Sequence, residues 1–206
     1  IYYIQKDRRG YMWFLTQEGV DRYDGKYIKH YNFSDDSIKL DSRIALNWLY
    51  MDSGNILWVI GQKGRIFRYD SQHDKFELAY VHPELIRNKP QAFLNYGYLD
   101  KSDRIWLCYK DSITWYDIRT GTTLHMPTPV NGEITAIEQT DDNHFFIGTG
   151  SGLFHARIEK GKLNIMPDKM MEGIGTSVHE LYYHAVSKQL FVGNYKEGIL
   201  IYDVGK

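Results

Sequence analysis

The sequence has almost no cysteine, no long apolar run and no block of charge of one sign. Its single cysteine, Cys108, cannot form an internal disulfide, and it lies in an apolar run at 106–109 where we expect a buried, inert thiol. No apolar run approaches the length of a membrane span, so attachment to a membrane would depend on segments outside this chain. The 25 basic and 26 acidic residues are interspersed and give a net charge of -1. A basic face for nucleic acid or anionic lipid is therefore not indicated.

Signatures of catalysis and of metal binding are also missing. His179 and His184 resemble the histidines of a zinc-protease motif, but that motif spaces its histidines four apart on a helix. Here the spacing is five, in a strand-like run, which sends the two rings to opposite faces. We therefore expect no cofactor, no metal and no catalytic residue. A glycan-active enzyme is the weakest alternative, and it stays open because paired carboxylates on loops leave no sequence signature.

What the sequence does contain is an internal repeat. Three copies share an aspartate, a tryptophan six residues later, and a tyrosine ten or eleven residues after the tryptophan. These copies contain Asp7, Trp13 and Tyr23; Asp52, Trp58 and Tyr69; and Asp100, Trp106 and Tyr116. Two weaker copies have Phe146 and Phe191 in place of the tryptophan, and Tyr202 restores the tyrosine in the last one. Because these residues recur at the same phase, we assign them to the scaffold.

The length of the repeat indicates the fold class. The copies begin at residues 7, 52, 100, 140 and 185, so the periods are 45, 48, 40 and 45. Periods of this size, built from short strands, are typical of β-propeller blades. The apolar residues alternate or run continuously, as in strands, and do not follow helical spacing. The sequence thus predicts an all-β chain of about five four-stranded propeller blades, forming one propeller segment over 1–206.

The blade boundaries follow from the repeat phase. We place the blades at about 1–35, 36–84, 85–128, 129–170 and 171–206, and in the second copy we predict strands at 44–51, 56–60, 65–70 and 76–81. The last blade is incomplete, since no fourth strand follows 198–203. The chain also begins without Met, so we expect a fragment of a larger propeller whose open blade ends support self-association. A self-closed ring of five blades is the alternative.

Each repeat also predicts particular turns. Between the first and second strands, the motif aspartate can bond the backbone two residues on, and a glycine such as Gly54 can adopt positive φ. The tryptophan that follows should pack between neighbouring blades. The aspartate after the motif tyrosine should open the next turn.

The first copy carries a family resemblance. Residues 4–25 read Ile-Gln-Lys-Asp-Arg-Arg-Gly-Tyr-Met-Trp-Phe-Leu-Thr-Gln-Glu-Gly-Val-Asp-Arg-Tyr-Asp-Gly. This phrase resembles the two-component-regulator propeller repeat, found in the periplasmic sensor region of Bacteroides-type hybrid two-component systems. The resemblance is specific in the first two copies, partial in the third and weak in the last two. Leu15 departs from it, standing where glycine is usual, and the third copy lacks the motif glycines.

The resemblance implies a role and a location. It implies an extracytoplasmic ligand-sensing domain, held in the periplasm as part of an inner-membrane sensor histidine kinase. The expected ligand is an oligosaccharide derived from a polysaccharide, and the expected output is control of glycan-use genes. Kinase chemistry would then lie elsewhere in the parent chain. The alternative is a non-catalytic propeller scaffold for dimerisation or for a protein partner.

Candidate ligand-binding residues lie on the loops that join the second strand to the third. Loops on a rigid scaffold are where propellers carry function. We assign ligand binding to Gln17, Gln62, Lys63, Lys110, Tyr195 and Lys196. Tyr195 would be a stacking platform for a sugar, and Lys63 or Lys110 would bind a carboxylate. The fourth-to-first-strand loops at 34–43, 82–91, 127–132 and 167–176 are expected on the same face.

Overall fold

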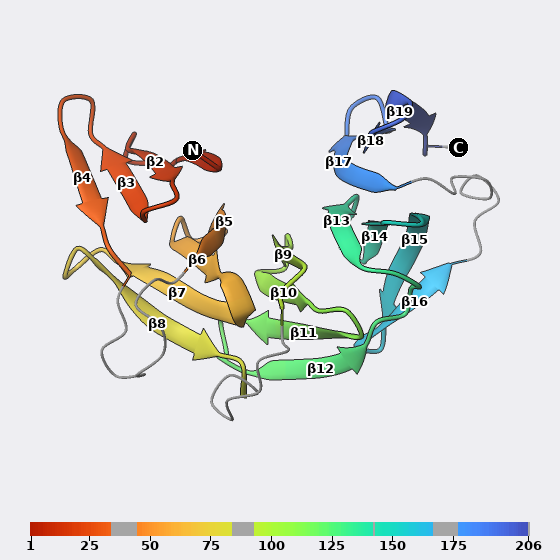
Figure 1. The fold of residues 1–206 in the computed structure, drawn as a ribbon, viewed down its shortest axis with the longest axis horizontal. Helices are drawn as coiled ribbons and strands as arrows, with labels where there is room; N and C mark the ends of the chain where they lie inside the picture. Colours follow the sequence, from red (N-terminus) through yellow and green to blue (C-terminus); the bar gives the residue numbers. More distant parts are fainter. Residues whose placement is uncertain (34–44, 84–92, 142, 167–176, 206) are drawn as a thin grey trace. The chain divides into compact units, whose positions relative to one another are not determined.

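The computed structural model describes residues 1–33, 45–83, 93–141, 143–166 and 177–205. In this part of the chain the strands form five sheets, and the strands follow one another in each sheet as they do in the chain (Figure 1). The chain divides into two compact units, Ile1–Leu99 and Asp100–Lys206. None of the described helical segments is long and apolar enough to cross a membrane.

The first unit contains the first two sheets and one further strand. Its elements are β1 (Tyr3–Lys6), β2 (Met12–Leu15), β3 (Val20–Tyr23), β4 (Ile28–Tyr31), β5 (Leu46–Met51), β6 (Leu57–Gly61), the 3-10 turn η1 (Gln62–Gly64), β7 (Arg65–Asp70), β8 (Lys75–Val81) and β9 (Tyr96–Leu99). We call β1–β4 the first blade and β5–β8 the second. The strands predicted for the second copy agree with β5–β8 to within two residues at each end.

The second unit contains the remaining strands. They are β10 (Arg104–Cys108), β11 (Ser112–Asp117), β12 (Thr123–Pro127), β13 (Ile134–Gln139), β14 (His144–Thr149), β15 (Gly152–Glu159), β16 (Lys162–Met166), β17 (Val178–His184), β18 (Gln189–Asn194) and β19 (Gly198–Asp203). We call β9–β12, β13–β16 and β17–β19 the third, fourth and fifth blades. The fifth has three strands among the described residues. The predicted all-β fold of propeller blades is confirmed.

The motif aspartate and tryptophan are bonded to each other inside each of the first three blades. In the first blade, Oδ1 of Asp7 accepts the amides of Arg9 and Tyr11, both at 2.9 Å, and Oδ2 accepts the indole N–H of Trp13 at 3.0 Å. The same indole bond measures 2.8 Å in the second and third blades. One carboxylate therefore shapes the turn and fixes the indole, which explains the constant spacing of six residues.

The turn itself differs from the prediction in one position. Its left-handed residue is the third after the motif aspartate, namely Gly10 (φ 91°), Asn55 (φ 64°) and Asp103 (φ 59°). The assignment of positive φ to Gly54 was therefore wrong, because Asn55 takes that conformation. Asparagine and aspartate tolerate the left-handed region better than other side chains. This tolerance explains how the third blade keeps the turn without glycine.

The core of each unit lies between consecutive blades. In the first unit, the buried ring of Trp13 packs edge-on against Tyr69 of the second blade, with centroids 4.8 Å apart. In the second unit, Trp106 of the third blade lies 4.9 Å from Phe145 of the fourth. Phe146 in turn joins the cluster that contains Leu190 of the fifth blade. In both units, aromatic side chains are thus buried between consecutive blades.

A second set of contacts ties the turns of the first and third blades to the blade that follows each of them. Arg8, directly after the motif aspartate, donates its amide to Oδ1 of Asn55 at 2.9 Å and its guanidinium to the carbonyl of Ser53 at 3.0 Å. Lys101 holds the equivalent position in the third blade. It donates its amide to Oε1 of Gln139 at 2.6 Å and its ammonium to the carbonyl of the same residue at 3.0 Å. We call this arrangement the forward clasp.

Candidate functional site

The predicted ligand-binding residues of the first unit lie at hairpin tips. Gln17 is exposed in the β2–β3 turn, and Gln62 and Lys63 are half-buried in η1 between β6 and β7. Lys63 has φ 69°, so its backbone is held in the left-handed region. Among the described residues, no hydrogen bond joins Gln17 to the other two. Their role in binding stays a prediction.

The remaining predicted residues lie at equivalent tips of the second unit. Lys110 is exposed between β10 and β11, and Tyr195 and Lys196 are exposed between β18 and β19. The amide of Lys196 donates to Oδ1 of Asn194 at 2.7 Å, which defines the shape of the tip. The structure therefore brings Tyr195 and Lys196 together and places Lys110 on a separate hairpin.

Tyr195 has the geometry of a presented aromatic platform. Its side chain is 85% exposed. His179, at the start of β17, supports the ring through an edge-on contact with centroids 4.0 Å apart. Nε2 of His179 lies 3.0 Å from the hydroxyl of Ser177. His179 was missed as a site residue by sequence reasoning. A separation of sixteen positions from Tyr195 offers no periodic signal, and the contact depends on the register of β17 with β18.

Of the fourth-to-first-strand loops, residues 34–43, 84–91 and 167–176 lie outside the described residues. The connection from β12 to β13 is described and is anchored to its neighbours. The amide of Thr128 donates to the carbonyl of Asp111 at 3.1 Å, and the hydroxyl of Ser151 donates to the carbonyl of Asn131 at 3.2 Å. The loops around Lys110 therefore form a hydrogen-bonded set.

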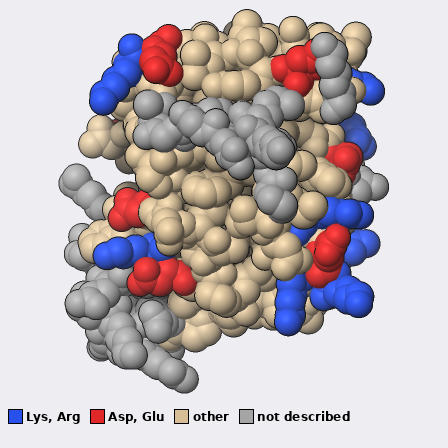
Figure 2. All heavy atoms as spheres, turned by 90° about the vertical axis from the view of Figure 1, so that its right-hand side faces the viewer, with Lys and Arg blue, Asp and Glu red and all other residues tan. Residues whose placement is uncertain are grey.

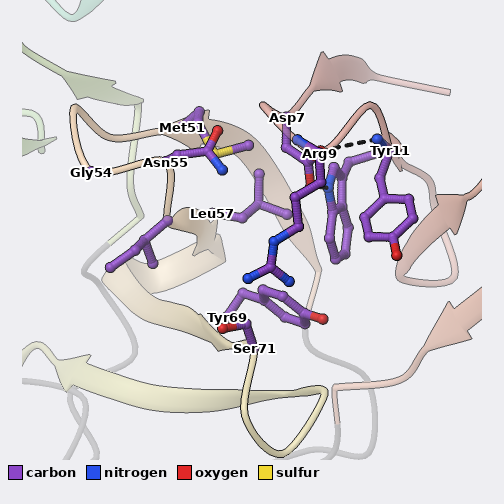
Figure 3. A pocket seen from close by; sticks show the side chains of 11 residues that line it. Asp7, Arg9, Tyr11, Met51, Gly54, Asn55, Leu57, Tyr69 and Ser71 are labelled. Atoms are coloured by element: carbon purple, nitrogen blue, oxygen red, sulfur yellow. Dashed lines mark hydrogen bonds between the residues drawn. The ribbon is translucent and has the colours of Figure 1, made fainter.

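A pocket in the first unit lies at the opposite ends of the blades, beside the β1–β2 and β5–β6 turns (Figure 3). It encloses about 160 Å³. Its lining includes Arg9 and Tyr11 from the first blade and Asn55, Leu57 and Tyr69 from the second. Sequence reasoning placed ligand binding at the other loops, so this pocket was not foreseen.

Beside the pocket, Asp74 gathers donors from both blades of the first unit. It lies in the β7–β8 turn and accepts bonds from Arg22 at 2.7 Å, Lys29 at 2.6 Å, Tyr31 at 2.6 Å and Tyr69 at 2.5 Å. Burial alone would raise the pKa of this carboxyl, but the four donors outweigh burial and hold that pKa well below its usual range. The network fixes the position of the Tyr69 ring that lines the pocket.

His179 and His184 have separate partners among the described residues, and Cys108 is buried. Among the described residues, no group of three or more His, Cys, Asp or Glu side chains could hold a metal ion. His179 contacts Tyr195, whereas Nδ1 of His184 lies 2.7 Å from the hydroxyl of Ser187. Cys108 is fully buried, and burial raises the pKa of its thiol far above the usual range.

These sheets, each an antiparallel meander packed on the next through aromatic residues, define a protein of the β-propeller class. No family model and no curated protein matches the sequence. Solved structures do match. The extracellular domain of BT3049, described as a hybrid two-component system of B. thetaiotaomicron, is 19% identical with a TM-score of 0.61, over 98% of this chain and 33% of that one.

Two further structures show how widely the fold is shared. The extracellular domain of BT4673, described as a hybrid two-component system of the same organism, is 13% identical with a TM-score of 0.60, over 94% of this chain and 32% of that one. A chain of a mitotic checkpoint complex is 10% identical with a TM-score of 0.70, over 98% of this chain and 62% of that one. The chain thus spans about a third of the length of the two B. thetaiotaomicron domains. At these identities the likeness establishes the fold.

Proposed function

We propose that this chain is an extracytoplasmic ligand-sensing domain that recognises an oligosaccharide. Its parent would be a hybrid two-component sensor histidine kinase of the inner membrane, with this domain in the periplasm. The fold shared with extracellular domains described as hybrid two-component systems supports the sensing role. The repeat phrase at residues 4–25 supports the same assignment.

The observation that carries the ligand class is the presentation of Tyr195. An exposed aromatic ring, held edge-on by His179 and adjacent to a lysine, suits stacking against the apolar face of a sugar. Lys196, Lys63 and Lys110 supply cations at hairpin tips, and they would bind the carboxylates of an acidic sugar. Gln17 and Gln62 supply amide groups for sugar hydroxyls.

The experiment is calorimetric titration of the folded chain with a set of neutral and acidic oligosaccharides. We expect saturable binding of at least one member, and we expect Tyr195→Ala to weaken it by about fivefold to tenfold. Tyr182→Ala is the matched control, because Tyr182 is also exposed but lies on β17 away from the tip. Equal weakening by both variants, or no binding by any oligosaccharide, would overturn the proposal.

A second candidate function is assembly, and a specific surface favours it. On the fifth blade, Tyr182, Ile199 and Ile201 are 59%, 71% and 57% exposed. Phe191, at the phase of the motif tryptophan, pairs with Tyr182 and Ile201 across the sheet. Its counterpart in the fourth blade, Phe146, is covered by the fifth blade. The repeat supports the proposal that another blade covers this face, and in this candidate function that blade belongs to a second copy.

Figure 2 shows one side of the molecule, on which basic and acidic side chains lie beside one another in several places. Light scattering over a range of concentrations tests assembly, and we expect a dimer that Ile199→Lys with Ile201→Lys disrupts. A concentration-independent monomer would exclude this candidate and leave ligand sensing untouched.

A further inference from the structure

We propose that the pocket between the first two blades binds a sugar acid, with Arg9 as the residue that binds its carboxylate. The site goes beyond the proposed function, because it lies in the first unit at the blade ends opposite to the β2–β3 and β6–β7 tips. Figure 3 shows the Arg9 side chain extending from the β1–β2 turn across the pocket toward Tyr69 and Ser71.

The charge of Arg9 is the first argument. Among the described residues, its guanidinium has no hydrogen-bond or ion-pair partner, whereas the guanidinium of Arg8 bonds the carbonyl of Ser53 and that of Arg22 pairs with Asp74. The nearby carboxylate of Asp7 is fully engaged by two amides and the Trp13 indole. Arg9 therefore presents a planar donor fork to the pocket, and such a fork matches a carboxylate in bidentate geometry.

The repeat supplies the second argument. The motif aspartate and tryptophan recur in the first three blades, and the forward clasp recurs in two of them, as Arg8 and Lys101. Arg9 does not recur, because its equivalents are Gly54 and Ser102. The turn folds with glycine or serine at this position, so the cation of Arg9 is not needed to build the scaffold.

The other residues that line the pocket suit the hydroxyls and the ring of the ligand. Oδ1 of Asn55 accepts the Arg8 amide, which fixes the side-chain amide and leaves its N–H groups for a ligand hydroxyl. The half-buried side chains of Tyr69 and Ile56 offer apolar surface for one face of a ring. A volume of about 160 Å³ suits one six-membered ring, since a cavity of ~150 Å³ admits benzene. A carboxylate, hydroxyls and one apolar face together describe a uronate.

The test is calorimetric titration of the full chain at low salt with glucuronate and galacturonate. Glucose is the control that lacks the carboxylate. Glutamate is the control that carries a carboxylate without a sugar ring. We expect saturable binding of a uronate, weakened at least tenfold by Arg9→Gln and less by Arg9→Lys, which keeps the charge but loses the fork. Arg68→Gln is the matched control, because Arg68 is exposed on β7 and lies outside the pocket lining.

The outcomes separate this site from the one at Tyr195. Retention of uronate binding in Tyr195→Ala, with loss in Arg9→Gln, supports the pocket whether or not an oligosaccharide binds elsewhere. Equal binding of glucose, tighter binding of glutamate, or an unchanged affinity in a folded Arg9→Gln protein would overturn the proposal. Circular dichroism and the thermal midpoint establish that the variant is folded.

Discussion

Oδ2 of Asp100 accepts the indole N–H of Trp106 at 2.8 Å, and the Asp100 side chain is fully buried. The same carboxylate accepts the amides of Ser102 and Arg104, both at 2.9 Å, and pairs with the Arg104 guanidinium at 2.7 Å. The fourth blade has Thr140 at the aspartate phase and Phe146 at the tryptophan phase, so it cannot form the bond between carboxylate and indole. Asp141, one residue later, accepts the turn amides of Asn143 and His144 at 3.0 Å instead. The two residues thus act as one unit.

This unit predicts strong coupling between the two positions. We expect Asp100→Thr to cost about 3 kcal/mol in the free energy of unfolding and Trp106→Phe about 1–3 kcal/mol, because each strands a buried partner. The double variant, which copies the fourth blade, should cost less than the sum by about 1 kcal/mol or more. Urea unfolding followed by circular dichroism measures the cycle. Additive costs would show that the hydrogen bond does not couple the pair.

Gly148 allows the fourth and fifth blades to approach closely. A Cβ at this position would lie 2.5 Å from Cγ1 of Val178 on β17. We expect Gly148→Ala to destabilise the protein by about 1–3 kcal/mol, and a second change, Val178→Ala, to lessen the effect of the first. Gly150→Ala is the control, since nothing lies within 4 Å of its Cβ. Thermal unfolding compares the variants, and equal midpoints for Gly148→Ala and Gly150→Ala would refute the tight approach.

Asp74 predicts a dependence of stability on acid pH. Its pKa is lower in the folded chain than in the unfolded chain, where a carboxyl titrates near ~4. The contribution of ionised Asp74 to the free energy of unfolding is therefore complete above about pH 5. It is lost as the pH falls through the pKa of the unfolded chain toward the lower pKa of the folded chain. Asp74→Asn should lower the thermal midpoint at pH 7. At pH 3 the difference in thermal midpoint between this variant and the wild type should be smaller. Glu77→Gln, on the same hairpin, is the control, and a constant difference across this range would contradict the assignment.

Burial of Cys108 predicts an unreactive thiol. Its pKa is raised by removal from water, so the nucleophilic thiolate is disfavoured in the folded state. We expect labelling by a disulfide reagent to be slower than in urea by about two orders of magnitude or more. The absorbance of the thiolate that the reagent releases measures the rate of labelling. Rapid labelling of the native chain would mean that the third blade opens readily.

Much of the fold could be predicted because every propeller blade repeats the same arrangement of strands. Strand positions in the second blade follow from the phase of Asp52 and Trp58, and period-2 patterning supplies the rest. The hydrogen bond between these two residues could not be predicted from their spacing. A separation of six residues does not place two side chains in contact unless the register of the hairpin is known. The same limit applies to the left-handed turn position, which falls on Asn55 although Gly54 is the stronger sequence signal.

The candidate sites were less accessible to sequence reasoning. Tyr195 could be singled out as an aromatic residue in a polar loop, but its partner His179 lies on another strand and depends on sheet register. The pocket at Arg9 is formed by two turns 45 residues apart, the separation of Arg8 from Ser53. Neither turn has a sequence feature that marks it as half of a pocket.

The forward clasp gives the chain a direction during synthesis. A ribosome releases the amino-terminal blades first, and domains generally fold in that order. Arg8 and Lys101 both bond to the blade that follows in the chain, to Ser53 and Gln139 respectively. In the first and third blades, the earlier-made turn therefore carries a cation whose carbonyl partners belong to the blade that is synthesised next.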